Sequence, residues 1–251
     1  MLPNLLRRTT RAAFDITIRS MSSTRKLTTL ELQYMKKQGK KISMVTAYDY
    51  PSAKHAENAE FDIVLVGDSL GMVVLGYETT LSVTMDDMLH HCKAARRGAP
   101  SRFIVGDLPF GSYESGPDEA LKNAFRLIKE SGVDAVKLEG GSKRAETIRK
   151  LVDSGVAVMG HIGLTPQGIG VLGGFRAQGR TAVKARQIVD DAIALQNAGA
   201  FALGDRKHIS TWKYTLPLYL FISSYFSCNM VDNLYIICPN YLVERFSILF
   251  L

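Results

Sequence analysis

The feature of this chain that most constrains its fold is a repeated unit, in which a short unbroken apolar run precedes a helical pattern. Residues 135–138 form one such run, and helical spacing follows over residues 143–154. Apolar runs of this kind are typical of strands buried on both faces of a parallel sheet. The other predicted strands are 42–47, 63–66, 103–105, 156–159 and 200–203. The other predicted helices are 27–37, 52–60, 86–97, 117–131 and 181–197. The alternation predicts an α/β protein with a mostly parallel sheet.

Polar side chains that are costly to bury follow four of these strands. Asp68 and Asp107 each belong to a Gly-Asp pair after a strand, and His161 follows the fifth strand in a Gly-His-Ile-Gly turn. Lys137 and Glu139 are two residues apart, so an extended strand points them to the same face. A barrel brings such strand ends to one mouth, whereas an open sheet spreads them along a crevice. We therefore predict a (β/α)8 TIM barrel that is incomplete here, with about five to six βα units.

The three carboxylates of this set favour a metal ion. Asp68, Asp107 and Glu139 supply only oxygen ligands, which a hard cation such as Mg²⁺ prefers. The alternative is that each aspartate caps the helix or turn after its strand. Three carboxylates at equivalent strand ends, with Lys137 nearby, favour the metal site over that alternative.

The basic residues of the set each have two candidate roles. Lys137 either forms a Schiff base, which requires a lowered pKa, or binds a substrate carboxylate as a cation. Neighbouring acids favour the charged ammonium and hence the second role. His161 is either a hydrogen-bonded structural histidine or a proton carrier. With Mg²⁺ on a 2-keto acid, the expected chemistry is proton removal beside the ketone and carbon–carbon bond formation.

The net charge of +7 is concentrated at the amino terminus. Residues 1–26 carry six basic side chains and one acidic one, and the remainder is nearly balanced. No basic face for nucleic acid is therefore expected. The segment is rich in Arg, Ser and Thr and lacks the apolar core of a secretory signal, which is the profile of an organellar transit peptide. We predict a mitochondrial protein, with a plastid or cytoplasmic location, and a simple disordered tail, as alternatives.

Residues 204–251 differ from the rest of the chain. They contain 10 of its 22 aromatic residues, no alanine and one glycine. The βα alternation stops here, so we interpret this apolar stretch as a divergent tail that follows a partial barrel over residues 27–203. The apolar run at 216–231 is interrupted by Pro217 and several serines. It is short and broken for a membrane span, so no membrane anchor is expected.

Five motifs give the chain a specific resemblance. They are MVTAYDYPSA at 44–53, LVGDSLGM at 65–72, GDLPFG at 106–111, VKLEGG at 136–141 and GHIGLTPQ at 160–167. Over residues 27–203 the chain resembles the ketopantoate hydroxymethyltransferase (3-methyl-2-oxobutanoate hydroxymethyltransferase) family. The resemblance implies a (β/α)8 barrel, often assembled as a homodecamer. It also implies transfer of a hydroxymethyl group from 5,10-methylenetetrahydrofolate to 3-methyl-2-oxobutanoate, giving 2-dehydropantoate for pantothenate and coenzyme A synthesis.

The resemblance also implies site residues. By motif, Asp68, Asp107 and Glu139 are the Mg²⁺ site, while Asp68, Ser69, Asp107 and Lys137 are the contacts of the keto acid. The family's proton-accepting glutamate aligns with Arg206, and the family's last two strands are absent. His161 is then the remaining catalytic candidate. Three interpretations stay open: an active hydroxymethyltransferase, a catalytically dead truncated isoform, and a Mg²⁺-dependent 2-keto-acid lyase or mutase of related barrel type.

Overall fold

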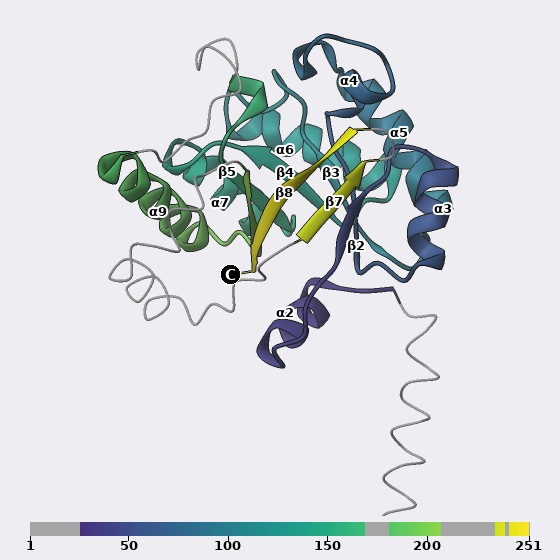
Figure 1. Ribbon diagram of the computed structural model, residues 1–251. Coiled ribbons are helices and arrows are strands. Elements are labelled where there is room, and N and C mark those ends of the chain that lie inside the picture. The colour runs from purple at the N-terminus through teal and green to yellow at the C-terminus, as the bar shows by residue number, and fades with distance from the viewer. Residues whose placement is uncertain (1–25, 169–180, 207–233, 239–240, 251) are drawn as a thin grey trace, which may run out of the picture.

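A computed structural model describes residues 26–168, 181–206, 234–238 and 241–250, with side chains described as far as residue 204 (Figure 1). The predicted transit segment, apart from Lys26, lies outside the described residues, as do residues 169–180 and residues 207–233 of the tail. Among the helices that are described, none combines the length and apolar character that crossing a membrane requires.

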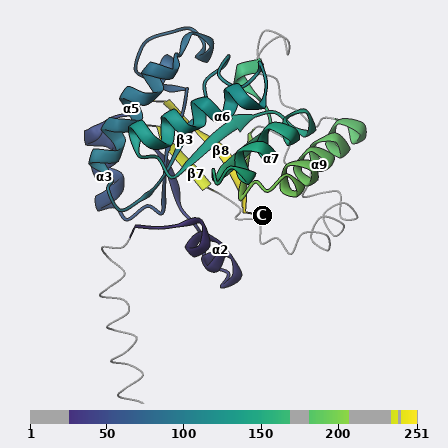
Figure 2. The same ribbon diagram turned by 180° about the vertical axis from the view of Figure 1, so that it is seen from behind.

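Six parallel strands pair in the order in which they occur in the chain. They are β1 (Met44–Thr46), β2 (Ile63–Val66), β3 (Phe103–Asp107), β4 (Ala135–Glu139), β5 (Val158–Gly163) and β6 (Ala202–Arg206). A doubly wound sheet reverses its strand order partway, whereas a barrel sheet does not. The sheet curls, with helices along its outer face (Figures 1 and 2). The predicted parallel α/β fold is therefore confirmed in its coarse form, as a curled half-barrel of six strands.

Two further strands come from the tail. They are β7 (Leu234–Cys238) and β8 (Tyr241–Phe250), which pair with each other in antiparallel fashion. β8 also pairs antiparallel with β6, from Ala202 opposite Phe250 to Arg206 opposite Phe246. β7 lies next to β1, so this hairpin stands between the last and the first parallel strand (Figure 1). The tail thus departs from the βα pattern, as its composition predicts, and still extends the sheet.

The described α-helices differ in how they begin, since some follow a side-chain cap and others do not. They are α2 (Thr29–Lys37), α3 (Tyr50–Asn58), α4 (Leu70–Val73), α5 (Met85–Gly98), α6 (Pro117–Arg126), α7 (Ala145–Asp153) and α9 (Ala182–Asn197). The run Thr84-Met85-Asp86-Asp87 predicts a capping box before α5, and it is present, since the side chains of Thr84 and Asp87 each accept from the other's backbone N–H. These paired bonds satisfy donors that a helix start leaves unpaired. The glycines of residues 71–80 predict a loop over that stretch, which is partly wrong, because α4 and a 3₁₀ turn at Thr80–Ser82 flank a shorter loop.

Both faces of the parallel sheet are buried, and alternate residues face different apolar clusters. In β4, Val136 and Leu138 pack towards the helices, whereas Ala135 packs into the cluster on the opposite, inner face. Lys137 and Glu139 share the inner face with Ala135, because side chains alternate along a strand. The inner cluster also receives Leu32 of α2. The predicted common face of Lys137 and Glu139 is therefore confirmed.

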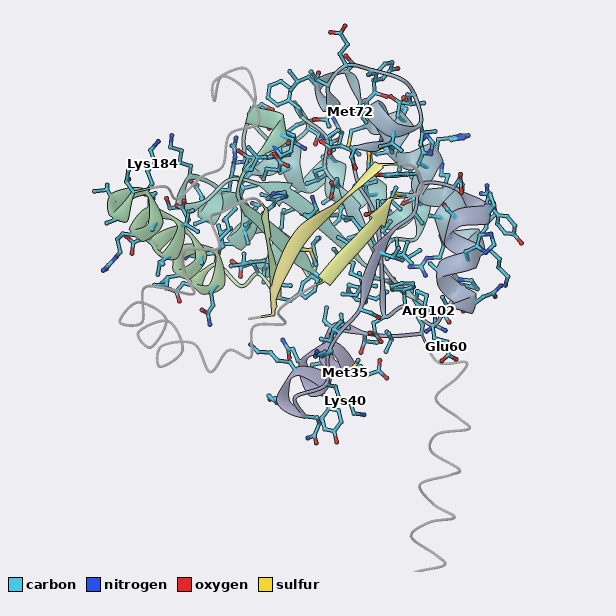
Figure 3. All side chains as sticks on the ribbon, viewed as in Figure 1. Met35, Lys40, Glu60, Met72, Arg102 and Lys184 are labelled. Carbon is cyan, nitrogen blue, oxygen red and sulfur yellow. The ribbon has the colours of Figure 1, made fainter. Side chains whose placement is uncertain are left out.

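The two ends of the sheet carry different side chains. Met35 of α2 and Lys40 lie at one end, and Met72 of α4 lies at the other (Figure 3).

Strand β5 begins two residues later than predicted and runs on to Gly163, so His161 lies within the strand and not in a turn. The apolar pattern predicts the wrong end for β5, because His161 is polar and is nevertheless buried in the strand, beside the carboxylate of Glu139 on β4.

Candidate active site

The carboxyl end of the sheet gathers five of the predicted residues. Asp107 of β3 pairs in register with Lys137 of β4, and Glu139 of β4 pairs with His161 of β5. Asp68 follows β2, the next strand along. All five side chains are buried. Because buried charges are stable only when paired or hydrogen-bonded, their partners define the site.

Lys137 forms an ion pair with Asp107. The Lys137 ammonium donates to Asp107 Oδ2 over 2.8 Å, and its nitrogen lies 2.8 Å from Oδ1. The Asp68 backbone N–H also donates to Asp107 Oδ2, over 3.2 Å. Burial opposes the charge on Lys137, but Asp107, Glu139 and Asp68 outweigh burial and raise the pKa of the amine. The ammonium form suits carboxylate binding, not Schiff-base formation.

The two other carboxylates are poorly compensated. Burial raises the pKa of Glu139 to about 8, although Lys137 opposes this. Burial and the neighbouring Asp107 raise the pKa of Asp68 to about 6. Burial also raises the pKa of Asp107. Three buried carboxylates thus share one ammonium, and the site has an excess of potential negative charge.

His161 lies between the strand end and the loop that follows. Its Nε2 bonds to the carbonyl oxygen of Leu164 over 2.9 Å, and Nδ1 lies 3.6 Å from Glu139 Oε1. Nε2 must donate in that bond, because a carbonyl oxygen only accepts. In the neutral ring Nδ1 is then the acceptor atom, and it faces Glu139. The hydrogen bond matches the structural role weighed for His161, and the position of Nδ1 keeps the proton-carrying role open.

Ser69 directly follows Asp68 in the sequence and directly precedes α4. Its hydroxyl is 2.8 Å from the Tyr48 hydroxyl, and it does not cap α4. Gly67, two residues before Ser69, fits closely: a Cβ there would lie 3.0 Å from Ser69 Oγ and 3.4 Å from Asp107 Oδ2. A side chain at position 67 would therefore displace two of the predicted keto-acid contacts.

Sequence reasoning missed two buried residues of the site, Gln167 and Tyr113. Gln167 donates through Nε2 to Asp68 Oδ2 over 2.8 Å and to the Leu108 carbonyl oxygen over 2.9 Å. Its backbone N–H donates to Glu139 Oε2 over 3.0 Å. Tyr113 donates a short hydrogen bond to Gln167 Oε1. The sequence feature that could have revealed Gln167 is its position at the end of the GHIGLTPQ motif, which begins with Gly160-His161.

Two observations bear on the predicted metal site, one against a preformed centre and one in favour of a hard cation. Within the described residues, no three His, Cys, Asp or Glu side chains converge as a ready metal centre. The donor set nevertheless suits a hard cation, because it offers only carboxylate oxygens at this point. One of them, the buried Asp107 Oδ1, accepts no well-aligned hydrogen bond even though Lys137 is near. A divalent cation would also offset the excess negative charge.

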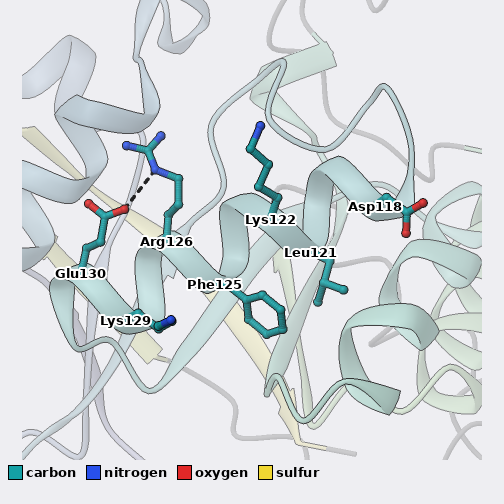
Figure 4. A pocket seen from close by; sticks show the side chains of 7 residues that line it. All are labelled: Asp118, Leu121, Lys122, Phe125, Arg126, Lys129 and Glu130. Carbon is teal, nitrogen blue, oxygen red and sulfur yellow. Dashed lines mark hydrogen bonds and ion pairs between the residues drawn. The ribbon is translucent and has the colours of Figure 1, made fainter.

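A hollow of about 480 Å³ lies elsewhere, on the outer face of α6 and the turn that follows (Figure 4). Its lining is Asp118, Leu121, Lys122, Phe125, Arg126, Lys129 and Glu130. None of the predicted site residues lies there. In Figure 4 Arg126 forms an ion pair with Glu130, and Arg126 Nε lies 3.1 Å from Glu130 Oε1. We therefore place the candidate active site at the strand ends and not in this hollow.

The fold and the site together define a class: α/β proteins whose polar site lies at the carboxyl ends of parallel, barrel-ordered strands. The chain belongs to the ketopantoate hydroxymethyltransferase family, whose model matches residues 26–204. It is 55% identical over 179 residues to 3-methyl-2-oxobutanoate hydroxymethyltransferase of Heliobacterium modesticaldum. It is 56% identical over 170 residues to the protein of the same name from Geobacillus kaustophilus.

These matches are partial on both sides. They cover 71% and 68% of this chain, and 65% and 61% of the two relatives, respectively. The chain thus matches less than two thirds of either relative's length. Apart from Gly204, the tail lies beyond the residues that the family model matches.

Two solved structures share the fold at low sequence identity. A phosphonopyruvate hydrolase in complex with oxalate and Mg²⁺ aligns with a TM-score of 0.57 and 15% identity, covering 79% of this chain and 69% of that one. A 2,3-dimethylmalate lyase of the PEP mutase/isocitrate lyase superfamily aligns with a TM-score of 0.51 and 19% identity, covering 69% and 60%. At these identities the likeness concerns the fold alone.

Proposed function

We propose that this chain binds Mg²⁺ and 3-methyl-2-oxobutanoate and transfers a hydroxymethyl group to that keto acid from 5,10-methylenetetrahydrofolate. The product is 2-dehydropantoate, an intermediate of pantothenate synthesis. The observation that carries the proposal is the buried Lys137–Asp107 pair, set beside Asp68 and Glu139, in a member of this family.

Different side chains of the site bind the keto acid and the metal ion. Lys137 supplies the only ammonium among the buried side chains of the described residues, so it receives the substrate carboxylate. Ser69 contributes a hydroxyl on the Asp68 side of the site. Asp68, Asp107 and Glu139 would hold Mg²⁺, which fits their oxygen-only donor set and uncompensated charge. When bound there, Mg²⁺ supplies Lewis-acid polarisation of the keto oxygen and so acidifies the adjacent C–H bond.

The chemical step then requires a base and a one-carbon donor. The base takes the proton from C3 of the keto acid, and the electron pair left on C3 forms a bond to the one-carbon unit. Water supplies the hydroxyl group, and tetrahydrofolate leaves. Among the described residues His161 is our candidate for moving this proton, because Nδ1 is its acceptor atom in the neutral ring and lies beside Glu139. A general base of this kind typically contributes about 10²–10⁴-fold to the rate.

A second candidate function is binding without turnover. The family resemblance places its proton-accepting glutamate at Arg206, and a guanidinium has no acceptor atom and does not release its proton in proteins. The family match also ends two residues before this position. These observations favour an isoform that keeps the ligands for metal and keto acid but lacks the base. The lyase or mutase alternative rests on fold likeness alone.

Two wider properties complete the proposal. From the family resemblance we propose a homo-oligomer, with the decamer as its form, which light scattering after gel filtration tests. From the composition of residues 1–26 we propose mitochondrial import, with plastid and cytoplasm as alternatives. Imaging of the full chain fused at its carboxyl terminus to a fluorescent protein tests the location, and deletion of residues 1–26 is the control.

The main experiment separates binding from turnover. The purified chain is incubated with Mg²⁺, 3-methyl-2-oxobutanoate and 5,10-methylenetetrahydrofolate, and 2-dehydropantoate is followed by mass spectrometry. Keto-acid binding is titrated in parallel. Product formation that Lys137→Met abolishes supports the proposed function. Binding without product selects the second candidate, and a folded protein that neither binds nor turns over refutes both.

A further inference from the structure

We propose that Gln167 is the positioning residue that holds two of the three carboxylates in place for a divalent cation. This inference rests on the proposed function, because it concerns the same carboxylates. Gln167 touches both Asp68 and Glu139, which belong to different strand ends. The side chain is buried, with 5% of its surface exposed. Gln167 reaches Asp68 through its side chain and Glu139 through its backbone N–H, and no other described residue donates hydrogen bonds to both carboxylates.

The orientation of the Gln167 amide follows from its neighbours. Its NH₂ group must face the Leu108 carbonyl oxygen, because that oxygen only accepts. The same NH₂ group then donates to Asp68 Oδ2. At the other end, Tyr113 donates to Oε1, and the Tyr113 oxygen accepts from the Glu139 backbone N–H over 3.1 Å. The amide is therefore fixed from both sides and delivers a donor to Asp68.

A neutral amide suits this position better than a cation. It satisfies Asp68 by a hydrogen bond without neutralising the cluster, so the negative charge stays available to a metal ion. The backbone N–H of Gln167 satisfies Glu139 in the same way. Each carboxylate has two oxygens with about four acceptor sites, so one donated bond leaves room for coordination. Groups of this kind, which hold a ligand without touching the metal, typically contribute about 10–100-fold to metal affinity.

The test measures cation binding directly and does not require turnover. Mn²⁺ serves as the probe for Mg²⁺, and the free Mn²⁺ signal in electron paramagnetic resonance reports the dissociation constant. Gln167→Met keeps the chain length of the side chain and removes its donors and its acceptor. We expect the Mn²⁺ dissociation constant to rise at least about 10-fold. Tyr113→Phe removes the hydrogen bond that fixes the amide and the acceptor of the Glu139 backbone N–H, but leaves the Gln167 donors in place, so it is expected to produce a smaller rise.

The matched control is Asn123→Leu. Asn123 is also a buried amide with 5% exposure, and it donates to the Ser112 carbonyl oxygen and to Glu119 without touching the three carboxylates. Both variants lose buried hydrogen bonds, so both are expected to unfold at lower urea concentration. Only Gln167→Met is expected to change the Mn²⁺ dissociation constant, which a merely structural role would not do.

The possible results are distinct. Equal Mn²⁺ affinity of the parent chain and Gln167→Met would overturn the positioning role while leaving the metal site intact. An equal loss of affinity in Asn123→Leu would also overturn it, since the effect would then be one of general stability. If the folded parent chain binds no Mn²⁺, the metal site of the proposed function fails, and the positioning role fails with it.

Discussion

Replacing Glu139 with glutamine is expected to stabilise the metal-free protein near neutral pH. Glu139 is buried, and burial raises the pKa of its carboxyl from 4.5 to about 8. Glutamine has a similar shape and keeps an oxygen that accepts from the Gln167 backbone N–H. Lys137 keeps its ion pair with Asp107, so the exchange does not leave a buried ammonium alone. The substitution therefore removes an ionisable group from an environment that disfavours its charge.

The sign and size of the effect follow from the two pKa values. Below pH 4.5 the carboxyl is protonated in both the folded and the unfolded chain and contributes nothing. Above it, the folded state holds a proton that the unfolded state releases, so stability falls as pH rises towards about 8. Each pH unit in this window corresponds to about 1.4 kcal/mol. At pH 7 the variant is expected to exceed the parent chain by about 3 kcal/mol in free energy of unfolding.

Urea unfolding at pH 5, 6, 7 and 8 in EDTA measures this difference. Glu146→Gln, which alters an exposed carboxylate on α7, is the control and is expected to change stability by less than about 0.5 kcal/mol. Saturating Mg²⁺ should shrink or reverse the advantage, because the cation stabilises only the chain that keeps the carboxylate. A Glu139→Gln variant that is less stable than the parent at pH 7 in EDTA, or a difference that does not grow with pH, would refute the reasoning.

Three other predictions concern single residues. Lys137→Met should weaken binding of 3-methyl-2-oxobutanoate by about 10–100-fold in calorimetry, because a charged hydrogen bond to the substrate is lost; unchanged affinity would exclude the carboxylate role. Burial raises the pKa of the Cys92 thiol, so iodoacetamide at pH 8 should leave it unlabelled in the native protein and label it in urea; native labelling, read by peptide mapping, would contradict its burial. Gly98→Ala should lower stability by about 1–3 kcal/mol, because its Cβ would lie 2.4 Å from the Tyr50 carbonyl oxygen; an unchanged urea midpoint would show that α3 and α5 are not packed this closely.

The sequence predicted the parallel sheet well because its strands are apolar on both faces. Ile63 and Leu65 pack on one side of β2, and Val64 and Val66 on the other, so the run shows no alternation. That pattern is typical of parallel strands covered by helices. The common face of Lys137 and Glu139 was likewise predictable, because it depends only on the two-residue repeat of a strand.

What the sequence did not predict depends on contacts between distant segments. The end of β5 was misplaced because His161 is polar, and only the neighbouring Glu139 explains its burial in a strand. Gln167 was missed because an amide has no acid–base chemistry of its own, and its importance comes from reaching Asp68, 99 residues away. The pairing of β8 with β6 was not predicted either, since the tail carries no βα pattern from which a register follows.

The central claim is that the strand ends of this half-barrel retain a site for a divalent cation and a 2-keto acid. Calorimetric titration of 3-methyl-2-oxobutanoate into the purified full chain, with Mg²⁺ and then with EDTA, tests it most directly. We predict saturable binding that requires Mg²⁺ and that Lys137→Met weakens. A protein that melts cooperatively and shows no saturable, Mg²⁺-dependent binding of the keto acid would contradict the claim.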